Sequence, residues 1–425
     1  MSLVASQTAD PAEPSSRPDL RVVEAEPKPP REFLVRGTPA YRRANLALFL
    51  SGFATFSLLY CVQPLMPLFA GDFGISPAAS SLSLSLSTGF LAFAIFCAAA
   101  VSEGVGRRSL MFFSLTGAAL CNIACGLMPD WHLLLAFRAL EGVLLGGVPA
   151  VAMAYLAEEI EPRGLGATMG LYIAGNAVGG MAGRAVTGTL AELWSWRPAL
   201  AGIGLIGLAM AIGFRLLLPP SRNFVPRKGF DARFHLRAWL EHLRNPALPF
   251  LFAVAFCVMG SFVTVYNYIG FRLVAAPYSL SQTELGLIFT AYLFGMAASW
   301  AAGVLGDRAG HFVMLPVGIL IAAIGVLVTL AASLWLIILG IVLVTIGFFV
   351  THSIASALVG RLARRTKGHA SSLYLLAYYL GSSVAGSLGG YFWLADGWQA
   401  VAWFVFAMLA ACLAAALCAA RFARS

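Results

Sequence analysis

Two charged residues with a spacing that can support chemistry lie inside a long apolar stretch of the chain. Arg138 and Glu141 belong to the stretch 132–157, where ionised side chains are costly. Because residues three apart are neighbours on a helix surface, we expect the two side chains to share one face. Glu141 is the only carboxylate that we place deep in such a stretch, so it is the leading candidate to take up and release a proton.

Arg184 and His352 are the other titratable groups that we single out. Arg184 lies in the stretch 167–190, at a depth similar to that of Arg138 on the neighbouring helix. We predict one partly buried charge cluster of Arg138, Glu141 and Arg184; the alternative is that Arg184 extends alone to the interface. His352 could relay protons, or it could be a hydrogen-bonded structural histidine.

The elements that must position these groups are membrane-spanning helices. Of the 425 residues, 60% are hydrophobic and only 11% are charged, too few for a soluble domain of this size. The apolar residues come in blocks of about twenty, which cross a bilayer as helix. The seven cysteines lie in these blocks without a CxxC pair, so we expect buried thiols, with no metal site and no cofactor.

The predicted fold class is an all-α polytopic membrane protein of about twelve helices in two bundles of six. The predicted spans are 44–69, 82–102, 109–128, 132–157, 167–190, 196–217, 247–272, 285–305, 312–331, 334–357, 371–394 and 398–420. Residues 1–43 are predicted to form a disordered cytoplasmic tail, and 218–246 a basic cytoplasmic linker between the bundles 44–217 and 247–425. In the linker, 233–243 could form an amphipathic helix on the membrane surface or remain a plain connection.

The positive charge follows the predicted topology. If the N-terminus is inside, the outer loops hold only Arg197 and Arg272, and two arginines lie within spans. All other basic residues fall on the inner side, so both termini are expected in the cytoplasm. The formal charge of +9 is therefore a topology signal, and a nucleic-acid partner is not expected.

The two halves of the sequence repeat. Residues 103–107 align with 307–311 at an offset of 204, and Tyr172 and Gly179 align with Tyr374 and Gly381 at an offset of 202. An even number of spans in each half makes the repeat parallel. Its axis is expected to run along the membrane normal, with a central cavity between the halves.

A short glycine-containing loop joins the second span to the third in each half. The residues concerned are Glu103, Gly106, Arg107, Arg108, Asp307, Arg308 and Gly310. An acid at the negative end of its own helix needs a positive partner elsewhere. We expect Glu103 to face the start of span eleven near Ser371 and Ser372, and Asp307 the start of span five near Ala167 and Thr168. The alternative is that both acids are ordinary interfacial charges.

Glycines and mid-depth polar side chains suggest how the helices pack and what they enclose. Glycines at 175, 179, 183 and 188 allow close helix contact. Aromatic and amide groups at mid-depth suit a small amphipathic ligand, although a single tyrosine is more often packing or an anchor. The candidates for helix packing are Gly175, Gly179, Gly183 and Gly188, and those for the cavity are Tyr60, Gln63, Tyr172, Asn176, Tyr266, Asn267, Tyr374 and Tyr378.

The motifs resemble those of the major facilitator superfamily. GxxxDRxG at 303–310 resembles its signature loop, RxxxG at 138–142 its second motif, and 179–188 its antiporter motif. Glu103 replaces the usual Asp of the first loop, and Arg184 stands where the antiporter motif has Pro, which puts a proline kink in doubt. The segments 170–184, 259–273, 370–386 and 389–393 are similar to the YnfM-type exporters of bacterial inner membranes.

This resemblance implies a secondary transporter that works by alternating access, with the two loops latching the inner gate. We expect export of a small amphipathic solute against an inward flow of protons, by a monomer in the inner membrane. Proton-coupled uptake and a sensor that transports nothing are the alternatives. The sequence has no phosphate loop, nucleophile motif or metal cluster, so we do not expect an enzyme.

Overall fold

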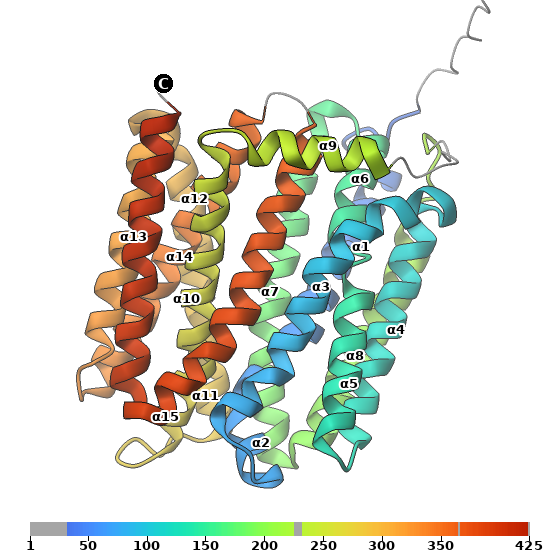
Figure 1. Ribbon diagram of the computed structural model, residues 1–425. Coiled ribbons are helices and arrows are strands. Elements are labelled where there is room, and N and C mark those ends of the chain that lie inside the picture. The colour runs from blue at the N-terminus through green and yellow to red at the C-terminus, as the bar shows by residue number, and fades with distance from the viewer. Residues whose placement is uncertain (1–31, 225–231, 364–365, 424–425) are drawn as a thin grey trace, which may run out of the picture.

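The structure is a computed structural model that describes residues 32–224, 232–363 and 366–423, without the side chains of 96–105, 150 and 232. Within this part of the chain the secondary structure is helical, apart from one isolated bridge between Leu34 and Ile160. Most helices stand side by side in one bundle, and a short one lies across an end of it (Figure 1). The predicted all-helical class is therefore confirmed.

The helices follow the predicted spans closely. Their bounds are α1 Pro39–Tyr60, η1 Gln63–Leu65, α2 Met66–Phe73, α3 Pro77–Val105, α4 Arg107–Leu127, α5 Trp131–Leu145, α6 Pro149–Glu159, α7 Pro162–Leu193, α8 Trp196–Leu217, α9 Ala232–Leu243, α10 Leu248–Val274, α11 Gln282–Ile288, η2 Phe289–Ala291, α12 Tyr292–Ala309, α13 His311–Val328, α14 Leu334–Leu362 and α15 Lys367–Phe422. Nine segments of the described residues are long and apolar enough to cross a membrane.

Several long helices are interrupted. The 56-residue α15 has non-helical backbone angles at Asp396 and Gly397, so two helices meet there. A break at 146–148 separates α5 from α6, and the short helix at Pro64 separates α1 from α2. Some helices begin earlier than predicted because a polar residue caps them. Thr38, for example, accepts a hydrogen bond from the backbone of Tyr41 and starts α1 before residue 44.

The two predicted glycine turns have matching backbone conformations. Gly106 joins α3 to α4 with φ of 88°, and Gly310 joins α12 to α13 with φ of 96°. Residues that have a Cβ atom rarely adopt a positive φ angle, so each tight turn depends on its glycine. Both turns lie at the end of the bundle that α9 crosses, which we call the α9 end; the opposite end is the far end (Figure 1).

Of the two alternatives for the linker, a helix is present, as α9. It spans Ala232–Leu243 and packs against the start of α15, where the Trp239 indole donates a hydrogen bond to Ser372. One face of α9 is buried and the other is exposed, with leucines and arginines along it. The helix therefore covers the α9 end of the bundle (Figure 1).

Glycines bring α7 directly against α1. Gly175, Gly179 and Gly183 each lie against the α1 backbone, near Phe49, Phe53 and Ser57. Because both sets repeat every four residues, one glycine stripe fits along one ridge of α1. In the second part of the chain, Gly381 of α15 lies against Phe256 of α10 in the same manner.

We expect Gly183→Leu to destabilise the protein by about 3 kcal/mol, because overpacking at this contact cannot be relieved by side-chain motion. A Cβ atom at Gly183 would lie 2.7 Å from the Ser57 Cα atom. The measurement is thermal unfolding in detergent. Gly170→Leu on the same helix is the matched control, because nothing lies within 4 Å of a Cβ atom there. Equal midpoints for the two variants would contradict the close contact.

Candidate functional site

Arg138 and Glu141 form a fully buried ion pair. The Arg138 Nη1 atom lies 2.5 Å from the Glu141 Oε2 atom, and both side chains have 0% exposure. The predicted pairing on one helix face is therefore present. The other carboxylate oxygen, Oε1, is buried without a hydrogen-bond partner among the described residues.

The Arg138 guanidinium has further acceptors besides the carboxylate. It donates to the carbonyl oxygens of Ser83, Leu58 and Leu59 at 2.8, 3.2 and 2.7 Å. It also lies 3.4 Å from the Asn122 Oδ1 atom. These contacts join α5 to α1, α3 and α4, so the ion pair lies where four helices meet.

Asn122 is a site residue that the sequence analysis missed. It is fully buried on α4 and donates a 2.7 Å hydrogen bond to the Leu200 carbonyl oxygen. Its Oδ1 atom faces Arg138 and the Cys61 thiol. An amide in the middle of the apolar stretch 109–128 was the available signal, because such groups in a span usually have a partner.

Arg184 is buried, but apart from the Arg138–Glu141 pair. Only 1% of it is exposed, so it does not extend to the interface alone. Its Nε atom donates to the Gln63 Oε1 atom at 2.6 Å, and its Nη1 atom to the Gly180 carbonyl oxygen at 2.7 Å. The three charges therefore do not form one contact cluster. Both arginines bond the α1–η1 segment, Arg138 at the carbonyl oxygens of Leu58 and Leu59 and Arg184 at the Gln63 side chain.

Aromatic rings surround the Arg184 guanidinium. Its Cζ atom lies 4.3 Å from the centre of the Tyr60 ring, 4.8 Å from that of Phe289 and 5.0 Å from that of Tyr292. Phe289 and Tyr292 belong to η2 and α12, so Arg184 lies where α7 meets a later part of the chain. These two rings were not among the predicted site residues, because nothing in the sequence shows that this segment faces α7.

The predicted cavity residues Gln63 and Asn267 meet directly. The Gln63 Nε2 atom donates a 2.8 Å hydrogen bond to the Asn267 Oδ1 atom. The Asn267 Nδ2 atom and the Tyr60 hydroxyl are buried without a partner among the described residues. A narrow crevice beside this pair is lined by Gln63, Pro64, Tyr266, Ile269, Gly270, Leu285, Ile288 and Phe289.

Contacts between earlier and later helices concentrate towards the far end. The Ser383 hydroxyl donates to the Ser85 carbonyl oxygen at 2.7 Å, and the Thr283 N–H donates to Glu192 at 2.7 Å. Gly188 lies against Gln282 of α11, so the fourth predicted packing glycine contacts α11 rather than α1. The helix pairs α3–α15 and α7–α11 thus hold the two parts of the chain together.

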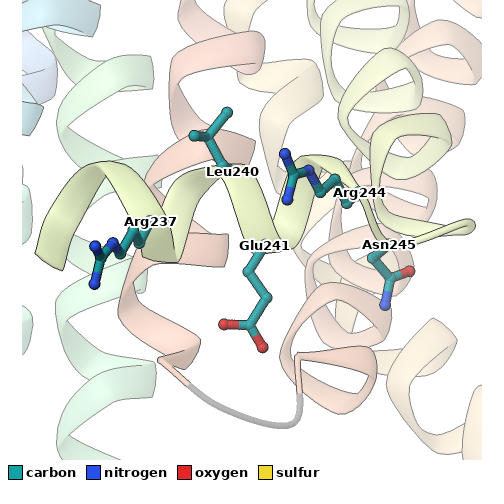
Figure 2. Close-up of a pocket in the computed structure, with 5 residues that line it drawn as sticks. All are labelled: Arg237, Leu240, Glu241, Arg244 and Asn245. Carbon is teal, nitrogen blue, oxygen red and sulfur yellow. The ribbon is translucent and has the colours of Figure 1, made fainter. Parts of the chain in front are cut away.

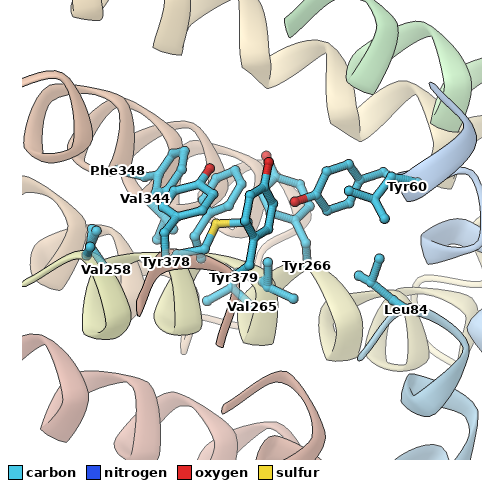
Figure 3. Packing of buried hydrophobic residues seen from close by; sticks show 14 of the residues in the cluster. Tyr60, Leu84, Val258, Val265, Tyr266, Val344, Phe348, Tyr378 and Tyr379 are labelled. Carbon is cyan, nitrogen blue, oxygen red and sulfur yellow. The ribbon is translucent and has the colours of Figure 1, made fainter. Parts of the chain in front are cut away.

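Three other predicted cavity tyrosines, Tyr266, Tyr374 and Tyr378, belong to one buried aromatic layer. Figure 3 shows Tyr266 and Tyr378 in it. Tyr266 bonds Thr345 at 2.8 Å and stacks on Phe289. Tyr374 bonds the His352 Nδ1 atom at 3.0 Å, and Tyr378 packs against the same imidazole ring. The described contacts of His352 are therefore with this layer and not with Glu141.

Two predicted cavity residues lie on α7. Asn176 is half-buried, and its Oδ1 atom lies against Gly52 of α1. Tyr172 is 3% exposed, and its hydroxyl has no partner among the described residues. Both residues therefore lie where α7 meets Gly52 of α1.

The loop residues at the α9 end find partners close by. Arg107 pairs with Glu158 at 2.8 Å, and Arg108 donates to the Arg215 carbonyl oxygen at 2.5 Å. Arg308 is exposed. The prediction for Glu103 lies outside the described side chains.

The expected contact of Asp307 with the start of α7 is not present. Asp307 pairs instead with Arg361 at 3.0 Å, at the end of α14. Thr168 is fully buried and bonds the Tyr41 hydroxyl and the Gly164 carbonyl oxygen. A guanidinium on the adjacent helix therefore supplies the positive partner that a helix N-terminus was expected to supply.

A shallow hollow on the outer face of α9 lies away from these groups. Arg237, Leu240, Glu241, Arg244 and Asn245 line it (Figure 2). Its residues come from one helix and the following turn. It is a surface feature and does not contribute to the central site.

Comparisons with known proteins point to one family. The family model described as the Major Facilitator Superfamily matches residues 48–274 and 266–424. Inner membrane transport protein YnfM of Escherichia coli (strain K12) is 46% identical over 380 residues, which are 89% of this chain and 91% of that protein. Multidrug resistance protein MdtG of Proteus mirabilis (strain HI4320) is 30% identical over 277 residues, 62% of this chain and 65% of that protein.

Solved structures give the same fold. The nucleoside transporter NupG matches with a TM-score of 0.74 at 11% sequence identity, covering 88% of this chain and 99% of that one. At this identity the likeness concerns the fold alone. The chain covers most of the length of both NupG and YnfM.

Proposed function

This chain belongs to the Major Facilitator Superfamily of transporters, and we propose that it exchanges protons for a small amphipathic solute that it exports across the bacterial inner membrane. Transport proceeds by alternating access, in which two bundles rock about a central site. The name of the relative MdtG, a multidrug resistance protein, supports export. The protein acts as a monomer and needs no cofactor.

The proposed topology has twelve spans. Splitting α15 at Asp396 and Gly397, and joining the interrupted pairs α1–α2, α5–α6 and α11–α12, divides the helices into two sets of six. The first set is α1 to α8 and the second α10 to α15, linked by α9. The α9 end is cytoplasmic, because the basic residues of the loops and of α9 lie there.

The observation that carries the proton-coupling proposal is the environment of Glu141. One carboxylate oxygen binds Arg138, and the other is buried without a partner among the described residues. Arg138 also has backbone carbonyl acceptors, so its charge stays hydrogen-bonded when Glu141 takes up a proton. Protonation of one member of a buried ion pair usually leaves the other charge without a partner, which is costly. The backbone acceptors of Arg138 lower this free-energy cost when Glu141 is protonated.

The test is proton flux in inside-out vesicles that hold a preformed proton gradient. Solutes that the protein exports are expected to release the gradient when added, because each solute molecule that enters a vesicle is exchanged for protons that leave it. A proton-coupled importer would leave the gradient standing, and a sensor would not respond to any solute. Vesicles without the protein are the control. Failure of every solute in a broad amphipathic panel would contradict the proposal.

A further inference from the structure

Arg184 is a buried cation without a carboxylate partner. No ion pair joins it to any acidic side chain in the part of the chain that the structure describes. Removing a guanidinium from water without an opposite charge is costly, and such charges inside membrane proteins usually have a function. The hydrogen bonds to Gln63 and Gly180 are to neutral oxygens, and the neighbouring rings are neutral too, so the net charge of the site stays positive.

The groups around Arg184 are rich in donors. The guanidinium has five N–H groups, of which two bond Gln63 and Gly180. The Tyr60 ring lies on the guanidinium, and its buried hydroxyl has no hydrogen-bond partner among the described residues. A site with spare donors and a net positive charge is complementary to an anionic group that offers several acceptor oxygens.

The same groups provide an apolar surface beside the charge. The rings of Tyr60, Phe289 and Tyr292 enclose the guanidinium, and Tyr266 stacks on Phe289. An inorganic anion would gain nothing from such rings, whereas an aromatic or aliphatic body would be buried against them. The site also bridges α7 to η2 and α12, so parting of these elements would open it.

We propose that Arg184 is the anchor for the negatively charged group of the transported solute, and that the solute is a small amphipathic organic anion such as an aromatic carboxylate. The inference rests on the proposed function, because it takes the bound anion as the solute that is moved. Its charged oxygens accept from Arg184 and Tyr60. When α7 parts from η2 and α12, its apolar body lies against Tyr266, Leu285 and Phe289, which line the closed crevice.

The test is to titrate each probe into the purified full chain in detergent and to measure its binding by calorimetry. The probes are matched sets with one body and three head groups: benzoate, benzamide and benzylammonium, and the same three derivatives of naphthalene and of octane. At least one carboxylate is expected to bind about 10- to 100-fold more tightly than its amide, the range for losing a charged hydrogen bond. Equal binding of all head groups, preference for the ammonium, or no binding would overturn the proposal. Inorganic phosphate and chloride are separate probes, and binding of these without a carboxylate preference would overturn it too.

Variants assign the preference to Arg184. Arg184→Gln is expected to bind the carboxylate no better than the amide, and Arg184→Lys to keep part of the preference because the charge remains. Arg197→Gln is the matched control, because Arg197 lies beyond the end of α7 and stacks on Trp196. A carboxylate preference that survives Arg184→Gln would contradict the assignment.

The vesicle assay separates this inference from the proposed function. If a carboxylate binds through Arg184 but releases no protons, the anion site stands and the proposed exchange fails. If amides or amines drive proton release and no carboxylate binds, the exchange stands and the anion site fails. Binding and proton release by the same carboxylate support both.

Discussion

Replacing Arg138 by methionine is expected to lower the free energy of unfolding by about 3–5 kcal/mol, the usual cost of removing one partner of a buried ion pair. The change leaves the Glu141 carboxylate at 0% exposure without its cation. It also removes the donor to the carbonyl oxygens of Ser83 and Leu59. We expect a lower yield of folded protein and a lower midpoint in thermal unfolding in detergent.

The double variant Arg138→Met with Glu141→Leu separates the cost of an unpaired charge from the cost of lost packing. It is expected to recover the part of the lost stability that comes from the unpaired carboxylate, because replacing both members of a buried pair by apolar side chains is often neutral or better. Arg197→Met, outside the bundle core, is the control for loss of an arginine. A single variant as stable as the wild type, or a double variant no better than the single, would contradict an ion pair in a dry site.

The positions of the helices could be predicted from the sequence because lipid imposes a simple rule. Each span must satisfy its own backbone hydrogen bonds, so an apolar block of sufficient length becomes a helix regardless of its neighbours. The predicted 196–217 coincides with α8, and the predicted linker helix at 233–243 is α9. The internal repeat then placed equivalent turns at Gly106 and Gly310.

Contacts within one helix were also predictable, whereas contacts between helices were not. Arg138 and Glu141 are one turn apart, so their meeting depends only on helix geometry. The neighbours of Arg184 depend on how α7 is rotated and on which helix lies beside it. Span depth alone suggested Glu141 as a neighbour, but the structure places the rings of Phe289 and Tyr292 there.

The partner of Asp307 illustrates the same limit. Its unfavourable position at the end of α12 correctly indicated a need for positive charge. Two groups could meet that need, the start of α7 and the arginine at the end of α14. Arg361 is on a helix that packs beside α12, so it meets the need without any contact to α7.

Replacing Glu141 by glutamine is expected to abolish proton release in the vesicle assay while leaving solute exchange intact. Glutamine has nearly the same shape, and its carbonyl oxygen can still accept from Arg138, so the four-helix junction should remain packed. It cannot take up or release a proton at neutral pH. Net proton-driven flux should therefore fall to background.

Solute exchange between two equal pools needs no net proton movement, so it reports whether the variant still binds and changes conformation. We expect radiolabelled exchange close to the wild-type rate in the Glu141→Gln protein. Glu241→Gln is the matched control, because Glu241 is exposed on α9. If the Glu141→Gln protein still released protons, Glu141 could not be the group that carries them. Loss of exchange together with proton release would instead mean that the charge of Glu141 maintains the structure, because a pure carrier is required only when protons must cross.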